Sequence, residues 1–222
     1  MLNFLLLSAG LGWRIKSKEP RSMLDIAGKS LLKRQSDNIR KCFPVENPTS
    51  ISIVSGFKPG RVRKESKSLG VKHFNNNKYK DTNQIESIRI FLNNSNVDNL
   101  FIIHGDLDFR IKFNEYQYDE SFTLYDDRNN FKQDEVGINI VDGFVNNLSY
   151  GLNTKWSQMF FLTGLELKLL KNICNTDNTY YLTFEILNKI IDLGGNFKAY
   201  RQNDNIYELD TIEEINNANF NC

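Results

Sequence analysis

A basic, glycine-containing loop near the start of the chain has the residue types needed to bind phosphate groups. Its two glycines, Gly10 and Gly12, permit positive φ and allow backbone N–H groups to approach a ligand closely. The segment that follows is basic, with only Glu19 opposing Arg14, Lys16, Lys18 and Arg21. Positive charge beside exposed N–H groups is expected to attract a polyphosphate.

Two carboxylates, Asp106 and Asp108, follow directly after the strongly apolar run Asn99–His104. Carboxylates beyond the end of a buried strand are costly unless something positive binds them. Mg²⁺ together with a nucleotide phosphate is the obvious candidate, because this ion prefers carboxylate and phosphate oxygens. The alternative is a solvated turn with no ligand.

The first hundred residues alternate between short apolar runs and helical patterns. Strands are predicted at Leu2–Leu7, Ser50–Ser55 and Val71–Phe74, with helices at 31–42 and 61–69 between them. A further helix is predicted to be capped at Asp81 or Thr82. Strands that alternate with helices favour a parallel sheet with right-handed crossovers, and therefore an α/β fold.

The second half of the chain adds antiparallel strands and two more helices. Asp142-Gly143, between the apolar runs 136–141 and 144–148, is the strongest hairpin signal in the chain. A strand is predicted at 158–163 and amphipathic helices at 165–173 and 180–193. The closing segment 206–215 predicts a short strand followed by a helix capped at Asp210 or Thr211.

The composition excludes several classes of function. A net charge of +1 over 222 residues gives no sign of a nucleic-acid or membrane partner, and no segment is apolar over the roughly 20 residues that span a bilayer. Three widely spaced cysteines predict neither a disulfide framework nor a zinc site. We therefore expect a soluble, cytoplasmic protein whose charges act locally.

The order of the motifs resembles the nucleotidyltransferases that make CDP-alcohols and nucleotide sugars. SAGLGWR, Pro20-Arg21 and the segment DIAGKSLL resemble the family's phosphate loop, with Arg21 at the place of a lysine. Within Asn75–Leu92, the order Asn, Tyr79, Thr82-Asn83, Ser87 resembles the base-side segment of phosphocholine cytidylyltransferases. The final ELDT resembles the family's closing motif. This resemblance implies a Rossmann-like (GT-A-type) fold, with a mostly parallel mixed sheet, flanking helices and a β-hairpin extension.

The resemblance also implies roles for particular residues. It assigns nucleotide binding to Ser8, Ala9, Gly10, Leu11, Gly12, Arg14, Thr82 and Asn83, and catalysis to Arg14 and Arg21. It assigns Mg²⁺ to Asp106 and Asp210, and the acceptor substrate to Trp156 and Glu185. Residues 1–110 would form the nucleotide-binding half of one domain, and residues 111–222 the acceptor-binding half.

The predicted activity is transfer of a nucleoside monophosphate from an NTP to a phosphorylated small molecule, with release of pyrophosphate. The base-side segment favours CTP and a phosphocholine-like or sugar 1-phosphate acceptor. Two alternatives stay open on sequence. One is a glycosyltransferase in which Asp106 and Asp108 form a DxD motif, and the other is a non-catalytic nucleotide-binding relative, motivated by Arg21 and Gln84.

Overall fold

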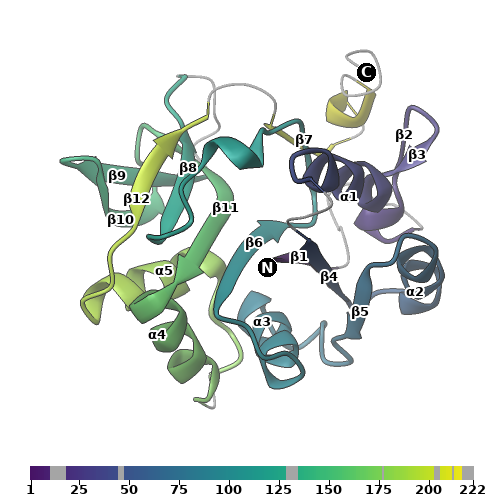
Figure 1. Cartoon of the computed structure of the whole chain (residues 1–222), viewed down its shortest axis with the longest axis horizontal. Helices are drawn as coiled ribbons and strands as arrows, with labels where there is room; N and C mark the ends of the chain where they lie inside the picture. The colour runs from purple at the N-terminus through teal and green to yellow at the C-terminus, as the bar shows by residue number, and fades with distance from the viewer. Residues whose placement is uncertain are drawn as a thin grey trace.

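A mixed nine-stranded sheet dominates the part of the chain that the computed structural model describes, which is residues 1–10, 19–44, 48–128, 135–176, 178–202, 206–211 and 213–216 (Figure 1). Its strands, in spatial order, are β5 (Lys72–Asn75), β4 (Thr49–Ser55), β1 (Leu2–Ser8), β6 (Asn99–His104), β11 (Lys155–Thr163), β8 (Phe122–Asp126), β12 (Lys198–Arg201), β10 (Phe144–Tyr150) and β9 (Val136–Val141). The first four strands are parallel, and β11 pairs with β6 in the antiparallel direction. The α/β prediction is confirmed, with the parallel pairing concentrated in the first half.

Helices cover both faces of the sheet (Figure 1). They are α1 (Leu31–Lys41), α2 (Pro59–Ser68), α3 (Gln84–Asn93), α4 (Gly164–Cys174) and α5 (Thr183–Asp192). In β1, Phe4 and Leu6 pack toward α1 and α2, whereas Leu5 and Leu7 pack toward the face covered by α3, α4 and α5. Because side chains alternate along a strand, one apolar run thus serves two cores.

The helix and strand boundaries follow local chemistry. Ser30 caps α1 by accepting a hydrogen bond from the Lys33 N–H at 3.1 Å. The predicted cap of α3 was one or two residues early, because Asn83 is the N-cap and Gln84 the first helical residue. Its buried apolar side includes Phe91, whereas Leu92 is only partly buried.

Three short pairings were not predicted from the sequence. β12 joins the main sheet in parallel with β8, and β7 (Leu107–Phe109) pairs with β13 (Ile206–Glu208) in the antiparallel direction. β2 (Asp25–Ile26) and β3 (Lys29–Ser30) form a small hairpin, and two 3₁₀ turns, η1 and η2, cover Arg21–Met23 and Phe113–Glu115. The β7–β13 ladder matters most here, because it attaches the closing segment to the end of β6.

Candidate active site

A cavity of about 690 Å³ opens where β1 and β6 end, beside the segment that leads from β5 to α3. Its lining comes from the ends of these strands, from the following loops and from the start of α3, and includes the predicted residues Ser8, Ala9, Gly10, Arg21, Thr82, Asn83 and Asp106. Leu11, Gly12 and Arg14 lie outside the described residues. Ligands of open α/β sheets bind in this crevice beyond the carboxyl ends of the strands.

At Gly105, the backbone that follows β6 lies in close contact with the end of β1. A Cβ at this position would lie 2.5 Å from the Leu7 carbonyl oxygen and 2.8 Å from the Ser8 Cβ. The Gly105 N–H also donates to the Leu7 carbonyl at 2.8 Å. Only glycine permits this contact, which places Asp106 directly beside the loop that follows β1.

One wall of the cavity, formed by the segment before α3 and by its first turns, consists of polar side chains held by one another. Asn76 is almost fully buried, and its amide donates to the hydroxyls of Thr82 and Ser87, each at 3.3 Å. Asn83 donates through its side-chain amide to the Tyr180 carbonyl at 2.6 Å. The Gln84 Oε1 atom is buried without a partner among the described residues, and Gln84 lines the cavity. Such a wall can read the edge of a base.

Arg21 joins the two carboxylates that the sequence predicted as metal ligands. Its guanidinium contacts the Asp106 carboxylate and reaches Asp210 at 2.8 Å. Pro20, with φ −57°, precedes η1 and sets the direction in which Arg21 leaves the backbone. The Leu209 N–H donates to the Asp106 carbonyl at 3.0 Å, which brings Asp210 to the end of β6.

Glu208 is the third carboxylate of this cluster and was not predicted as a site residue. Oxygens of Asp106, Glu208 and Asp210 lie within 4.8 Å of one another. Burial raises the Glu208 pKa, and the nearby Lys155 charge opposes that effect. A usable signal was present, because residues two apart in an extended segment point the same way and Glu208 precedes Asp210 by two.

The closing helix fixes Asp210 from the other side. Thr211 accepts a hydrogen bond from the Glu214 N–H at 3.2 Å, and the Glu214 carboxylate accepts from the N–H groups of Asp210 and Thr211, each at 2.8 Å. This reciprocal arrangement is a capping box, and the predicted cap at Thr211 is the one observed.

These three carboxylates fit a Mg²⁺ ion. They supply hard oxygen donors from two adjacent segments, and the Asp106 Oδ1 atom is buried without a hydrogen-bond partner among the described residues. Arg21 already neutralises part of their charge. A cation at the site would therefore share Asp106 and Asp210 with this guanidinium.

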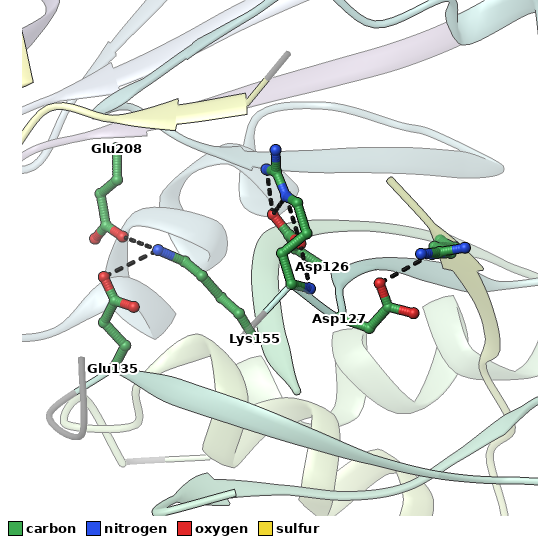
Figure 2. A network of polar contacts seen from close by, with 7 residues as sticks. Asp126, Asp127, Glu135, Lys155 and Glu208 are labelled. Carbon is green, nitrogen blue, oxygen red and sulfur yellow. Dashed lines mark hydrogen bonds and ion pairs between the residues drawn. The ribbon is translucent and has the colours of Figure 1, made fainter. Parts of the chain in front are cut away.

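A second cavity, of about 260 Å³, lies next to the carboxylate cluster. Lys155 projects into it between two acids, with its ammonium 2.9 Å from Glu135 and 3.2 Å from Glu208 (Figure 2). Burial disfavours the Lys155 charge, but the two carboxylates outweigh it and its pKa is raised. Arg128 pairs with Asp126 at the same cavity, whose lining thus includes two cations and two carboxylates beside uncharged residues.

The two predicted acceptor residues lie outside both cavities. Trp156 is 2% exposed, and its indole N–H donates to the Thr123 hydroxyl at 2.8 Å within the core. The Glu185 carboxylate accepts from the Leu182 N–H at 2.7 Å and so caps α5. The second cavity contains Lys155 and Arg128, neither of which was predicted as a site residue.

Asp108 is used structurally and does not join the carboxylate cluster of Asp106, Glu208 and Asp210. Its carboxylate forms a bidentate pair with Arg34 of α1, with donor–acceptor distances of 2.9 and 2.6 Å, and is 3% exposed as a residue. A DxD site would need Asp108 beside Asp106, and among the described residues the carboxylates gathered there are Glu208 and Asp210. This geometry does not support the glycosyltransferase alternative.

Comparisons with known proteins establish the fold as that of nucleotidyltransferases. No protein-family model and no curated sequence matches the chain. Solved structures do match over nearly the whole length, at sequence identities of 12 to 17%. The resemblance predicted from the sequence is therefore confirmed at the level of the fold.

Three of these structures illustrate the match. The CTP:phosphocholine cytidylyltransferase LicC from Streptococcus pneumoniae superposes with a TM-score of 0.79 and 17% identity, over 99% of this chain and 98% of its own. The inositol-1-phosphate CTP transferase from T. maritima superposes with a TM-score of 0.76 and 16% identity, over 96% of this chain and 91% of its own. HddC from Yersinia pseudotuberculosis, solved with GMP-PN, superposes with a TM-score of 0.77 and 16% identity, over 100% of this chain and 99% of its own.

In the described part of this chain, no helix combines the length and the apolar character needed to cross a bilayer.

Proposed function

We propose that this chain is a nucleotidyltransferase that transfers CMP from CTP to a phosphorylated small molecule, either phosphocholine-like or a sugar 1-phosphate, and releases pyrophosphate. The observation that carries the proposal is the cluster of Arg21 with Asp106, Glu208 and Asp210. It lies where the large cavity at the strand ends meets the smaller, charged cavity.

The two cavities support a division of the chain into two substrate sites. Among the described residues, all those that line the large cavity precede residue 110, and all but one of those that line the smaller cavity follow it. We assign the nucleotide to residues 1–110 and the acceptor to residues 111–222. Lys155 and Arg128 are the cationic groups that would face the acceptor phosphate.

The reaction is an in-line displacement at the α-phosphorus. An oxygen of the acceptor phosphate forms the new P–O bond, the bond to the β-phosphate bridging oxygen breaks, and pyrophosphate leaves with that electron pair. The attacking oxygen is already anionic, so no general base is required. Catalysis then consists of positioning and charge neutralisation.

This chain's residues divide those tasks. Backbone N–H groups of the loop after β1, with Arg14, would hold the triphosphate, and Thr82 and Asn83 would contact the base. Arg21 would neutralise the charge that develops at the α-phosphate, from its place between Asp106 and Asp210. Asp106, Glu208 and Asp210 would hold Mg²⁺, which would supply further positive charge to the triphosphate.

A pyrophosphate-release assay tests the proposal. The protein is incubated with Mg²⁺, each of the four NTPs in turn, and phosphocholine or a set of sugar 1-phosphates. We expect release with CTP and one class of acceptor, and a loss of at least about 100-fold in Asp106→Asn. Asp119→Asn, which removes an exposed carboxylate outside both cavities, is the matched control and should retain full activity.

Two results would contradict the proposal. The first is the absence of pyrophosphate release with every NTP and acceptor pair, accompanied by unchanged nucleotide affinity in Asp106→Asn. The second is release of a sugar from a nucleotide sugar in the absence of any NTP, which would restore the glycosyltransferase alternative.

A further inference from the structure

Asn76 is a buried amide in the wall of the large cavity, between β5 and α3. It is 1% exposed, and its backbone N–H donates at 2.8 Å to the carbonyl of Ser55, the last residue of β4. Its side-chain Oδ1 atom accepts from the Lys78 N–H at 2.9 Å. Since a backbone N–H can only donate, this contact fixes which end of the amide is the oxygen. The Nδ2 atom is thereby directed to the hydroxyls of Thr82 and Ser87, at 3.3 Å from each.

The two hydroxyls that receive these hydrogen bonds differ in what they can offer a ligand. The Thr82 hydroxyl donates its own proton to the Lys78 carbonyl at 2.8 Å, so toward the cavity it can only accept. The Ser87 oxygen accepts from Asn76, and no group among the described residues accepts the Ser87 proton. Ser87 is 3% exposed and lines the cavity, so this proton is available to a ligand. The wall thus presents one acceptor and one donor, both set by a single amide.

This pair of groups matches one edge of cytosine. Position 4 of cytosine carries an amino group, which donates, and its N3 atom accepts. Uracil has the reverse order, because its O4 atom accepts and its N3 atom carries a hydrogen. The acceptor of Thr82 and the donor of Ser87 can therefore bond both groups of cytosine at once. Uracil in the same orientation would set two acceptors against each other at Thr82 and two hydrogens at Ser87, which leaves buried polar atoms unpaired.

We propose that Asn76 is a positioning residue that sets the base preference of the site, because its amide fixes Thr82 as the acceptor for the amino group and Ser87 as the donor to N3 of cytosine. The proposal rests on the proposed function, which assigns the nucleotide to the large cavity. An amide suits this place, because its oxygen serves the Lys78 N–H while its nitrogen serves the two hydroxyls.

The test exchanges the donor end of this amide for an acceptor. In Asn76→Asp the new carboxylate keeps the contact with the Lys78 N–H, but its other oxygen accepts from the Ser87 hydroxyl instead of donating to it. Ser87 then presents a lone pair to the base, which suits the N3 hydrogen of uracil. Isothermal titration with CTP and with UTP, in Mg²⁺ and without an acceptor, gives the two Kd values. We expect the wild type to prefer CTP by about 10-fold or more, and Asn76→Asp to lose or reverse this preference.

Asn77→Asp is the matched control, since it adds the same charge at the neighbouring position. Asn77 is exposed and does not line the cavity. Its new charge should change the affinities for CTP and UTP by the same factor and leave their ratio at the wild-type value. The control separates a weaker attraction for the triphosphate from a change in how the base is bound.

A double-mutant cycle tests whether Asn76 acts through Ser87. Ser87→Ala removes the donor and should lower the ratio of CTP affinity to UTP affinity by about 10-fold. In that background, Asn76→Asp should cause no further change in the ratio. Additive effects would mean two independent contributions and would refute the positioning role. A purely structural effect of Asn76 would weaken both nucleotides equally and leave the ratio unchanged in either background.

The outcomes separate this proposal from the proposed function. If the wild type releases no pyrophosphate but prefers CTP, and Asn76→Asp removes that preference, the proposed function fails and the role of Asn76 stands. If the wild type binds CTP and UTP equally, or a folded Asn76→Asp keeps the wild-type ratio, the role of Asn76 is wrong, whatever the enzyme does. If circular dichroism shows that Asn76→Asp is unfolded, Ser87→Ala decides, and an unchanged ratio refutes the proposal. A wild type that binds neither nucleotide overturns both.

Discussion

Removal of Arg21 should make the stability of this protein depend on divalent cations. Arg21→Ala leaves three carboxylates within 4.8 Å of one another without their shared guanidinium. At an effective dielectric constant of about 20, two unit charges at that separation repel by about 3.5 kcal/mol. Since breaking a partly buried ion pair costs a similar amount, we expect a loss of about 3 kcal/mol in unfolding free energy.

Magnesium should reverse most of this loss in the variant. A ligand present at 100 times its Kd stabilises the folded state by about 2.7 kcal/mol. The assay is urea unfolding of wild type and Arg21→Ala, each in EDTA and in excess Mg²⁺. Arg21→Lys keeps the positive charge but lacks the guanidinium fork that contacts both Asp106 and Asp210. Its unfolding free energy should therefore lie between those of the wild type and Arg21→Ala.

A solvated arginine provides the control for this experiment. Arg61 pairs with Glu19 at 2.7 Å, but its side chain is 61% exposed. Arg61→Ala should therefore change the unfolding free energy by less than about 1 kcal/mol, with or without Mg²⁺. If Arg21→Ala loses the same stability in EDTA and in Mg²⁺, the carboxylates do not form a cation site and the reasoning is refuted.

Three further predictions test the framework around the site. Asp108→Asn removes the carboxylate charge that the Arg34 guanidinium contacts through two hydrogen bonds, and it should lower the unfolding free energy measured in urea by about 3 kcal/mol. A Mn²⁺ titration should stay unchanged, and a weakened titration would revive the DxD alternative. Gly105→Ala should lower the unfolding free energy by about 2 kcal/mol and abolish most of the pyrophosphate release. Gly60→Ala, whose added Cβ meets nothing within 4 Å, should lower neither the stability nor the release. Burial and the Arg63 charge lower the His73 pKa, so on acidification His73 is protonated in the unfolded state before it is protonated in the folded state. The urea midpoint should therefore fall as the pH drops below about 6.5. His73→Gln should reduce this fall, and an equal slope of midpoint against pH in both proteins would contradict the prediction.

Strong periodic patterns in the sequence were sufficient to predict most of the fold. The run 2–7 could only be a buried strand, and the Asp142-Gly143 pair fixed a hairpin that the structure confirms. β12 was missed because its four residues, KAYR, are partly buried and show no clear alternation. Such a strand is stabilised by its neighbours β8 and β10, which local patterns do not identify.

The second cavity, which we propose for the acceptor, was the least predictable part of the candidate site. The assignment of Trp156 rested on resemblance, and the structure gives its indole a partner in the core, Thr123. Lys155 directly precedes Trp156 and projects into the second cavity, since neighbours on a strand point to opposite faces. A shift of one position along β11 therefore exchanges a core residue for a cavity residue.

The large cavity, which we propose for the nucleotide, was easier to predict for a topological reason. The chain places β4 and then β5 on one side of β1, and returns to place β6 on the other side. Leu7 pairs with His104 in the β1–β6 register, so the loops after both strands begin at the same level. A crevice must open where the strand order reverses, and residues that follow either strand must line it. Ser8 and Asp106 meet there because of this crossing, and Arg21 contacts Asp106 from the segment that follows the loop.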